Sequence, residues 1–327
     1  MAGRATLARL VDATLEGSVV GGYSRVGPIV RGRLEHWSDP PSLTGRICLV
    51  TGASGGLGLA ASTGLARLGA SVRLLVRDAR RGEDARRQIV AETGNEDVHC
   101  QLVDLSLRRS VRACAARIVA GGEPVHVLVH NAGVLPPERR ETEEGFELTF
   151  ATNVLGPHLL TRLLRERLVA SAPARVLFVS SGGMYTRHLD VEDLQSREGE
   201  FDGRAAYARS KRAEVVLMER WAEELAGTGV VAHAMHPGWA DTPGIQSSLP
   251  VFRRVMRPLL RTPEQGADTI VWLAAAAEPG AVTGRFWCDR HARTTHYPLT
   301  HTRETADERE RLWVALEALA AGASARI

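Results

Sequence analysis

The sequence has almost no lysine. All but one of its 41 basic side chains are arginine, and the exception is Lys211. The two residue types differ physically, because lysine carries a compact ammonium on a flexible stem whereas arginine carries a planar fork of N–H donors. A single lysine in such a chain indicates a position that requires a compact ammonium and where the planar guanidinium of arginine would not function.

Other absences narrow the class of protein. Cys48, Cys100, Cys114 and Cys288 are far apart and form no CxxC pair, which argues against a zinc site and against a disulfide framework. We therefore expect no bound metal, and a reducing compartment such as the cytoplasm. No stretch approaches the ~20 apolar residues of a membrane-spanning helix, and the first residues hold no apolar run long enough for a signal peptide. The net charge of +3 gives no case for nucleic-acid binding.

Residues 1–42 differ from the rest of the chain. They are rich in glycine and end in Trp37-Ser38-Asp39-Pro40-Pro41, which is typical of a linker. We expect an N-terminal extension with a short helix at Ala5–Leu15 that packs against the main domain. Peripheral membrane contact or partner binding is left open for it. The whole chain, with 327 residues of which 44% are apolar, can bury a sizeable core.

From Arg46 onward, short apolar runs alternate with helical stretches. This alternation predicts parallel strands joined by right-handed crossovers, and the runs lack a polar face, as expected when helices cover both sides of a sheet. We predict one α/β domain over residues 43–295, a Rossmann-type doubly wound parallel sheet, with a C-terminal helical tail over 296–327. The predicted strands are 47–50, 71–76, 98–103, 125–129, 175–179, 230–235 and, as the last strand, 285–288; the predicted helices include 80–92, 110–119, 143–169, 205–225 and 264–277.

Ligands of such sheets bind beyond the carboxyl ends of the strands, and unusual residues follow six predicted strands. The first strand is followed by the glycine cluster Gly52-Ala53-Ser54-Gly55-Gly56-Leu57-Gly58. A tight glycine turn that opens a helix lets a phosphate approach the helix N-terminus. The cluster lacks the Gly-Lys-Ser/Thr ending of a nucleoside-triphosphatase loop, so ATP is disfavoured. The other strand-end residues are Arg77, Asp78, Asp104, Asn131, Ser181, Pro237 and Gly238.

Arg77 stands where a dinucleotide-binding domain meets the adenosine ribose. Arginine there would pair with the 2′-phosphate of NADP, whereas an acid would bind the 2′-hydroxyl of NAD. Asp78 is one residue late for the acidic role. A solvated basic surface shared with Arg80 and Arg81 is the alternative explanation for Arg77. The sequence therefore favours NADP(H), with NAD(H) as the other candidate.

Tyr207 and Lys211 lie four residues apart in the predicted helix 205–225, so they share one helical face. A tyrosine ordinarily titrates near pH ~10, and an adjacent ammonium stabilises the phenolate. Such a tyrosine is a candidate general acid and base. Taken alone, the same spacing also fits two solvated side chains on a helix surface.

Taken together, these motifs resemble the short-chain dehydrogenase/reductase family over roughly residues 45–290. His130 departs from the pattern, since the family usually has asparagine there. The long interval from Ser181 to Tyr207 resembles the retinol-dehydrogenase-like branch. Residues 180–184, 193–196 and 236–244 and the N-terminal extension resemble most the subgroup called dehydrogenase/reductase family member 12. The matching elements in chain order are Thr51-Gly52-x3-Gly56-x-Gly58, Asp104-Leu105, Asn131-Ala132-Gly133, Asn153, Ser180-Ser181, Tyr207-x3-Lys211 and Pro237-Gly238.

The resemblance implies hydride transfer between NADP(H) and a small carbonyl or alcohol substrate. Tyr207 would be the acid/base, and Lys211 would also hydrogen-bond the nicotinamide ribose. Ser181, preferred over Ser180, would donate to the substrate oxygen, and Asn153 would hold a water that links Lys211 to solvent. A homo-oligomer is common for this fold and is left open. The implied cofactor contacts are Gly52, Ser54, Gly56, Leu57, Gly58, Arg77, Asp104, Leu105, Asn131, Ala132, Gly133, Tyr207, Lys211, Pro237, Gly238 and Thr242.

Two regions are expected to shape an apolar substrate site. One is 184–203, with Tyr185, Leu189 and Phe201, and the other is 250–261, in which apolar residues alternate with arginines. The second region fits a mobile lid with apolar residues inward and arginines in water, or a surface that meets a lipid interface or an anionic, lipid-like substrate. A cofactor-binding scaffold with little turnover is the rival function. The Ser, Tyr and Lys set disfavours it, because a binding module needs no proton donor.

Overall fold

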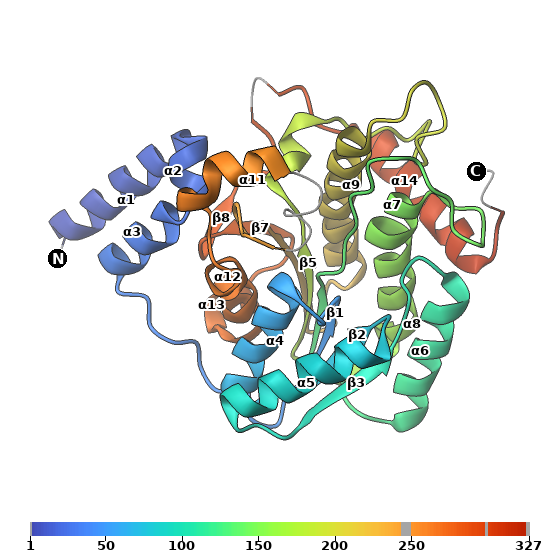
Figure 1. The fold of residues 1–327 in the computed structure, drawn as a ribbon, viewed down its shortest axis with the longest axis horizontal. Coiled ribbons are helices and arrows are strands. Elements are labelled where there is room, and N and C mark those ends of the chain that lie inside the picture. The colour runs from blue at the N-terminus through green and yellow to red at the C-terminus, as the bar shows by residue number, and fades with distance from the viewer. Residues whose placement is uncertain (1, 243–249, 298–299, 325–327) are drawn as a thin grey trace.

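The computed structural model describes residues 2–242, 250–297 and 300–324. Its centre is an eight-stranded sheet with the order β3-β2-β1-β4-β5-β6-β7-β8 (Figure 1). All neighbouring strands pair in parallel except β7 and β8, which are antiparallel. The strands are β1 (Ile47–Thr51), β2 (Ser71–Val76), β3 (Val98–Leu102), β4 (Val127–His130), β5 (Ala174–Val179), β6 (Val230–Met235), β7 (Arg285–Cys288) and β8 (His291–Arg293).

Helices cover both faces of the sheet, which confirms the doubly wound fold. Side chains alternate along each strand, so Leu49 packs into the cluster on one face and Val50 into the cluster on the other. The Leu49 face is covered by α6 (Arg108–Gly121), α8 (Gly156–Ala170) and α9 (Gly203–Glu224). The Val50 face is covered by α4 (Gly56–Arg67), α5 (Ala79–Thr93) and α12 (Pro263–Ala275).

Two predictions about the elements were wrong. Arg285–Cys288 is not the last strand, because the chain turns back at once into the short antiparallel β8. The predicted helix 143–169 is three elements: α7 (Leu148–Phe150), the π-helical η1 (Ala151–Leu155) and α8. The carboxylate of Glu147 accepts hydrogen bonds from the N–H groups of Thr149 and Phe150, so it acts as an N-cap and the helix begins after it.

The N-terminal extension forms three helices instead of one. They are α1 (Ala2–Gly17), α2 (Val19–Tyr23) and α3 (Val26–Glu35), and the predicted helix Ala5–Leu15 lies within α1. Figure 1 shows these helices beside β8 and α11 (Pro250–Met256), at the end of the molecule opposite the C-terminal helix α14 (Ala306–Ala321). The remaining short helices are η2 (Gly182–Thr186), η3 (Arg257–Leu259) and α13 (Ala277–Gly280).

Candidate active site

The glycine turn after β1 has no room for side chains. Gly52 and Gly56 have φ of +66° and +55°, in the left-handed region that favours glycine. A Cβ on Gly58 would lie 2.4 Å from both Asn131 Nδ2 and the carbonyl oxygen of Gly52. Helix α4 begins at Gly56 without a side-chain cap, so its first N–H groups are available to a phosphate.

Thr51 ties this turn to the strand end beside it. Its Oγ1 accepts hydrogen bonds from the N–H groups of Asn131 (2.9 Å) and Ala132 (3.0 Å). The Asn131 amide returns a bond from Nδ2 to the carbonyl oxygen of Thr51 at 2.9 Å. These bonds join the ends of β1 and β4. Thr51 was quoted in the motif but was not predicted as a site residue.

Arg77 and Asp78 follow β2, and Asp104 follows β3. Asp78 is the N-cap of α5 and accepts a hydrogen bond from the N–H of Arg81 at 2.9 Å, so its carboxylate is committed to the helix. Arg77 is exposed, and a Cβ on Gly55 would lie 3.7 Å from the Arg81 guanidinium. Asp104 Oδ1 accepts from Ser106 N (2.9 Å) and Oγ (2.6 Å). The guanidinium of Arg81 thus lies beside the glycine turn. Leu105, after β3, is buried.

Lys211 lies in a closed site next to Tyr207. Its Nζ is 5.5 Å from the centroid of the Tyr207 ring, and only 3% of the residue is exposed. The ammonium donates to the carbonyl oxygen of Val179 (2.9 Å) and to Glu214 Oε1 (2.7 Å). Burial lowers the pKa of Lys211, but the charges of Glu214 and Tyr207 outweigh it and raise that pKa. Burial raises the pKa of Glu214 to about 7, against the opposing effect of Lys211.

Asn153 projects from the π-helical segment towards the same ammonium. Its Oδ1 accepts from Val134 N (2.9 Å), and its Nδ2 donates to Ser210 Oγ (2.9 Å). A Cβ on Gly133 would lie 3.3 Å from Lys211 Nζ and 3.5 Å from Asn153 Oδ1. The structure therefore brings Gly133, Asn153 and Lys211 together. A π-turn inserts one extra residue into a helix and often marks a functional site.

The two serines after β5 have different surroundings. Ser180 is buried, and its Oγ donates to the carbonyl oxygen of Lys211 at 2.8 Å. Ser181 is partly exposed, and its Oγ accepts from Gly183 N at 3.2 Å. Ser180 thus holds α9 against the sheet, while Ser181 is the serine that a substrate can reach.

The turn after β6 is shaped by His236. Its Nδ1 accepts from the N–H of Gly238 at 3.0 Å, and Gly238 has φ of +69°. Burial lowers the pKa of His236 to about 3, with Arg261 as the next cause, so the ring stays neutral. Pro237 lies in this turn, and Thr242 is the last residue that the structure describes before Pro250.

Several residues expected near the substrate lie elsewhere. Tyr185 and Leu189 are buried in the core, and Tyr185 OH donates to the carbonyl oxygen of Thr294 at 2.6 Å. In the region 250–261, the pattern of apolar residues inward and arginines outward holds only in part: Leu260 is buried and Arg254 and Arg257 are exposed, but other positions depart from it. Val251 and Val255 are 72% and 70% exposed, whereas Arg261 is 1% exposed, because it is paired inside the molecule with a buried carboxylate. The side chain of Phe252 lies outside the described residues.

Three residues near the site were missed from the sequence. Glu214 follows Lys211 by three positions, and this spacing on a helix was a usable signal. Tyr23 and Asp289 come from segments remote from every motif, and no local pattern pointed to them. Tyr23 reaches the site because the extension packs beside the turn after β6, and Asp289 lies in the turn between β7 and β8.

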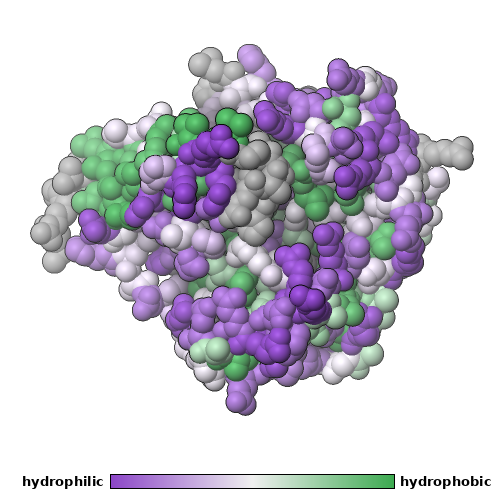
Figure 2. Space-filling model, viewed as in Figure 1, coloured by the Kyte–Doolittle hydropathy of each residue, from purple (hydrophilic) through white to green (hydrophobic). Residues whose placement is uncertain are grey.

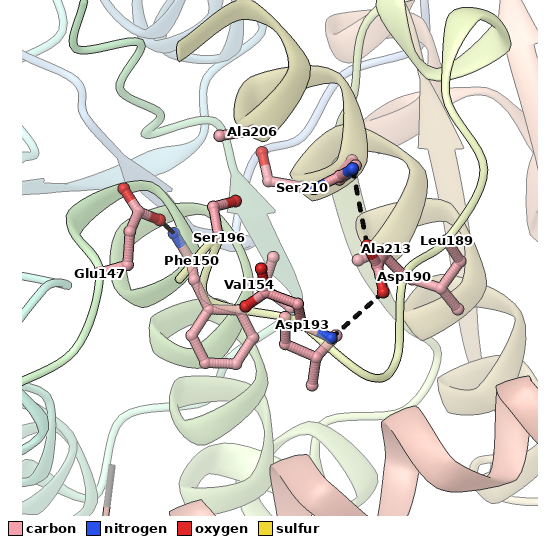
Figure 3. Close-up of a pocket in the computed structure, with 12 residues that line it drawn as sticks. Glu147, Phe150, Val154, Leu189, Asp190, Asp193, Ser196, Ala206, Ser210 and Ala213 are labelled. Atoms are coloured by element: carbon pink, nitrogen blue, oxygen red, sulfur yellow. Dashed lines mark hydrogen bonds and ion pairs between the residues drawn. The ribbon is translucent and has the colours of Figure 1, made fainter. Parts of the chain in front are cut away.

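A small cavity lies beside α9, between the π-helical segment and the loop around Asp190 (Figure 3). Phe150 and Val154 line one side and Ala213 the other, and Asp193 N donates to Asp190 Oδ1 at 3.1 Å. Neither Ser181 nor the Tyr207–Lys211 pair lines this cavity. It is a packing gap under the loop and not the place where the chemistry would occur.

Comparison with known proteins gives a consistent result. A family model described as short chain dehydrogenase matches residues 46–250. Human dehydrogenase/reductase SDR family member 12 is 41% identical over 282 residues, which cover 85% of this chain and 87% of the relative. Human retinol dehydrogenase 12 is 37% identical over 273 residues, covering 83% and 85%. The RhlG/NADP active-site complex of Pseudomonas aeruginosa superposes with a TM-score of 0.63 at 27% identity, covering 76% of this chain and 96% of that one.

Proposed function

The chain belongs to the short-chain dehydrogenase/reductase family and is an oxidoreductase of that family; from this premise we propose that it interconverts a carbonyl and an alcohol by hydride transfer, with a preference for NADP(H) and for an apolar substrate. The observation that carries the proposal is the buried Lys211 ammonium, 5.5 Å from the Tyr207 ring. The glycine turn fits a dinucleotide, because α4 begins at Gly56 without a side-chain cap and leaves its first N–H groups to a phosphate. When bound, the nicotinamide supplies or accepts the hydride.

The chain's own residues then handle the proton. In the reduction, the Tyr207 hydroxyl donates its proton to the oxygen that becomes the alcohol, and Ser181 donates a hydrogen bond to the same oxygen as charge develops there. The ammonium of Lys211 stabilises the phenolate left on Tyr207. In the oxidation the phenolate takes the proton back. Asn153, in contact with the Lys211 surroundings, would hold a water through which the pair exchanges protons with solvent.

The rival function is a cofactor-binding scaffold with little turnover. An activity panel separates the oxidoreductase from the scaffold. Aliphatic and aromatic carbonyls and alcohols are tested with NADPH, NADP⁺, NADH and NAD⁺, and turnover is followed by nicotinamide absorbance. We expect turnover of at least one class of apolar carbonyl, faster with NADPH than with NADH. Tight cofactor binding without turnover on any member of the panel would favour the scaffold.

The preference for NADP(H) is supported by Arg77. Asp78 caps α5 through one carboxylate oxygen, and the exposed Arg77 lies next to it at the end of β2. We expect Arg77→Glu to lower the affinity for NADPH by about 100-fold, because a charge-assisted pair becomes a repulsion. The affinity for NADH should stay nearly unchanged. Fluorescence titration of both cofactors measures this. Arg87→Glu, at an exposed position of α5, is the control. Equal losses of affinity for both cofactors would refute the pairing of Arg77 with the 2′-phosphate.

The cytoplasm, with peripheral contact to a lipid surface, is the proposed location. The free cysteines support a reducing compartment. Figure 2 shows hydrophobic residues gathered over the end of the molecule that holds α1, α2 and α11. These helices contain Leu10, Val19 and Val251, which are 62%, 60% and 72% exposed. Among the described residues no helix is long and apolar enough to cross a membrane. Co-sedimentation with liposomes, with and without anionic lipid, tests the contact, and no binding to either would exclude it.

A further inference from the structure

Tyr23, at the end of α2, reaches the edge of the sheet where the catalytic residues lie. Its ring packs edge-on against His236 and Trp239, with centroid distances of 4.3 and 5.9 Å. A Cβ on Gly182 would lie 2.5 Å from Tyr23 Cε2 and 3.2 Å from its hydroxyl oxygen. Since Gly182 directly follows Ser181, the phenol lies between the loop after β5 and the turn after β6.

The backbone around Tyr23 holds the second of these segments. The N–H of Trp239 donates to the carbonyl oxygen of Tyr23 at 2.8 Å. A Cβ on Gly238 would lie 2.6 Å from that same oxygen and 2.3 Å from Arg261 Nε. Gly182 is therefore required by its contact with the Tyr23 ring, and Gly238 by its contacts with the Tyr23 carbonyl oxygen and Arg261. Neither contact is predictable from the family motifs, which begin after the extension.

A buried ionic group fixes the extension in this place. Arg261 donates to the carbonyl oxygen of Gly22 at 2.6 Å and to both carboxylate oxygens of Asp289 at 2.6 and 3.0 Å. Arg31 of α3 donates to Asp289 Oδ2 at 2.5 Å. These three charged side chains are 1–2% exposed. Removing one partner would leave an uncompensated buried charge, so the position of Gly22 and Tyr23 is strongly specified.

We propose that the N-terminal extension completes the substrate site, and that Tyr23 is a specificity-determining residue that contacts the substrate beside Ser181. With His236 and Trp239 it forms an aromatic wall, which suits a carbonyl compound carrying a flat apolar substituent such as an aromatic ring. Burial raises the pKa of Tyr23, so the phenol keeps its proton and offers a hydrogen-bond donor. It therefore positions the substrate and does not replace Tyr207 as the base. This inference rests on the proposed carbonyl chemistry.

The test compares an aromatic ketone with a small aliphatic aldehyde in the full-length chain. We expect Tyr23→Ala to raise KM for the ketone at least tenfold with kcat within threefold, and to leave both parameters for the aldehyde and the affinity for NADPH unchanged. Tyr23→Phe separates the wall from the donor, because it keeps the ring and removes the hydroxyl. Trp37→Phe, which alters another aromatic residue of the extension that packs on Arg290, is the control. Equal changes for both carbonyls, or none, would overturn the inference.

Gly182→Ala supplies an independent arm. The new Cβ collides with the Tyr23 ring in the wild-type chain but has room once residue 23 is alanine. We therefore expect Gly182→Ala to lower kcat/KM for the ketone at least tenfold in the wild type and less than threefold in the Tyr23→Ala background. Equal losses in both backgrounds would overturn the contact.

Failure of the proposed function gives a different result. A chain that consumes NADPH with neither carbonyl would refute the carbonyl chemistry, and binding then decides the present inference. Saturation-transfer NMR of the ketone on the NADP⁺-loaded chain should show contact in the wild type and its loss in Tyr23→Ala. Equal binding to the two proteins, or none to the wild type, would overturn the role of Tyr23.

Discussion

Two buried ionic groups lie near the carboxyl edge of the sheet, and their carboxylates are used differently. Asp289 engages both of its oxygens with two arginines, Arg31 and Arg261. Glu214 engages one oxygen with Lys211, and within the described residues its Oε2 has no hydrogen-bond partner. Burial raises the pKa of Glu214 to about 7, whereas Asp289 lies between two permanent cations. The Glu214 carboxyl can therefore change its protonation state near neutral pH, whereas the Asp289 carboxylate is fully engaged with its two arginines.

This difference separates chemistry from architecture. A site that moves protons needs groups whose protonation can change near the working pH, and the Lys211 pair lies beside Tyr207, the proposed acid and base. A group that fixes one segment against another needs charges that stay paired. Asp289 does this for the extension.

Tyr207→Phe should have the largest effect. It removes the only hydroxyl assigned to proton transfer, so kcat should fall by about 10³-fold, within the range known for general acid–base catalysis. The affinity for NADPH, measured by fluorescence titration, should stay nearly the same. Retained turnover would remove Tyr207 from the mechanism.

Lys211→Arg keeps the charge and changes the geometry. The Lys211 ammonium is held by Val179 and Glu214, and a Cβ on Gly133 would already lie 3.3 Å from Nζ, so the wider guanidinium fork does not fit. We expect kcat to fall by about 10²-fold while the chain stays folded by circular dichroism. Arg209→Lys, the reverse exchange two residues earlier on the same helix, is the control. Near-normal activity of Lys211→Arg would show that charge alone suffices.

Asp289→Asn acts on the other group. It leaves two buried arginines without their shared counter-charge, and we expect a loss of about 3 kcal/mol in the free energy of unfolding. Urea unfolding followed by tryptophan fluorescence measures it. Asp84→Asn, in an exposed pair with Arg87, should change little. Equal effects of the two substitutions would mean that the Asp289 group does not anchor the extension.

Glu214→Gln should change how the free energy of unfolding depends on pH. Because burial raises the pKa of Glu214 to about 7, the folded chain binds a proton that the unfolded chain has released above about pH 4.5. Its stabilising contribution is thus complete below that pH and is lost as the pH rises through about 7. Relative to Glu214→Gln, the wild type should lose unfolding free energy over this interval. A constant difference between the two proteins from pH 4.5 to 8 would contradict it.

The sheet and its site-bearing strand ends were predictable from the sequence because their signals are local. Strands such as Ser71–Val76 and Val230–Met235 are short segments rich in apolar and β-branched residues, and their observed bounds match the prediction. The glycine turn and the Tyr207–Lys211 spacing depend on neighbours in the chain. Arg261 shows the limit of such reasoning. It looked like a solvated arginine in an amphipathic segment, and its burial follows from Asp289, a partner distant in sequence.

The start of the helix after Glu147 and the role of Tyr23 were unpredictable for related reasons. Glu147 fits a helix interior by propensity, and only its capping bonds show that the helix begins after it. Tyr23 is placed by the carbonyl groups of its own segment, which Arg261 and Trp239 bind. Contacts made through the backbone leave no pattern of side chains to recognise.

The central claim is that this edge of the sheet transfers a hydride between NADP(H) and a carbonyl. It is tested most directly with NADPH deuterated at both C4 positions of the nicotinamide, incubated with the wild-type chain and a carbonyl substrate. We predict that mass spectrometry finds one deuterium bound to the carbinol carbon of the alcohol product, and that Tyr207→Phe forms almost none of this product. An alcohol without deuterium, or labelled product formed equally well by Tyr207→Phe, would contradict the account.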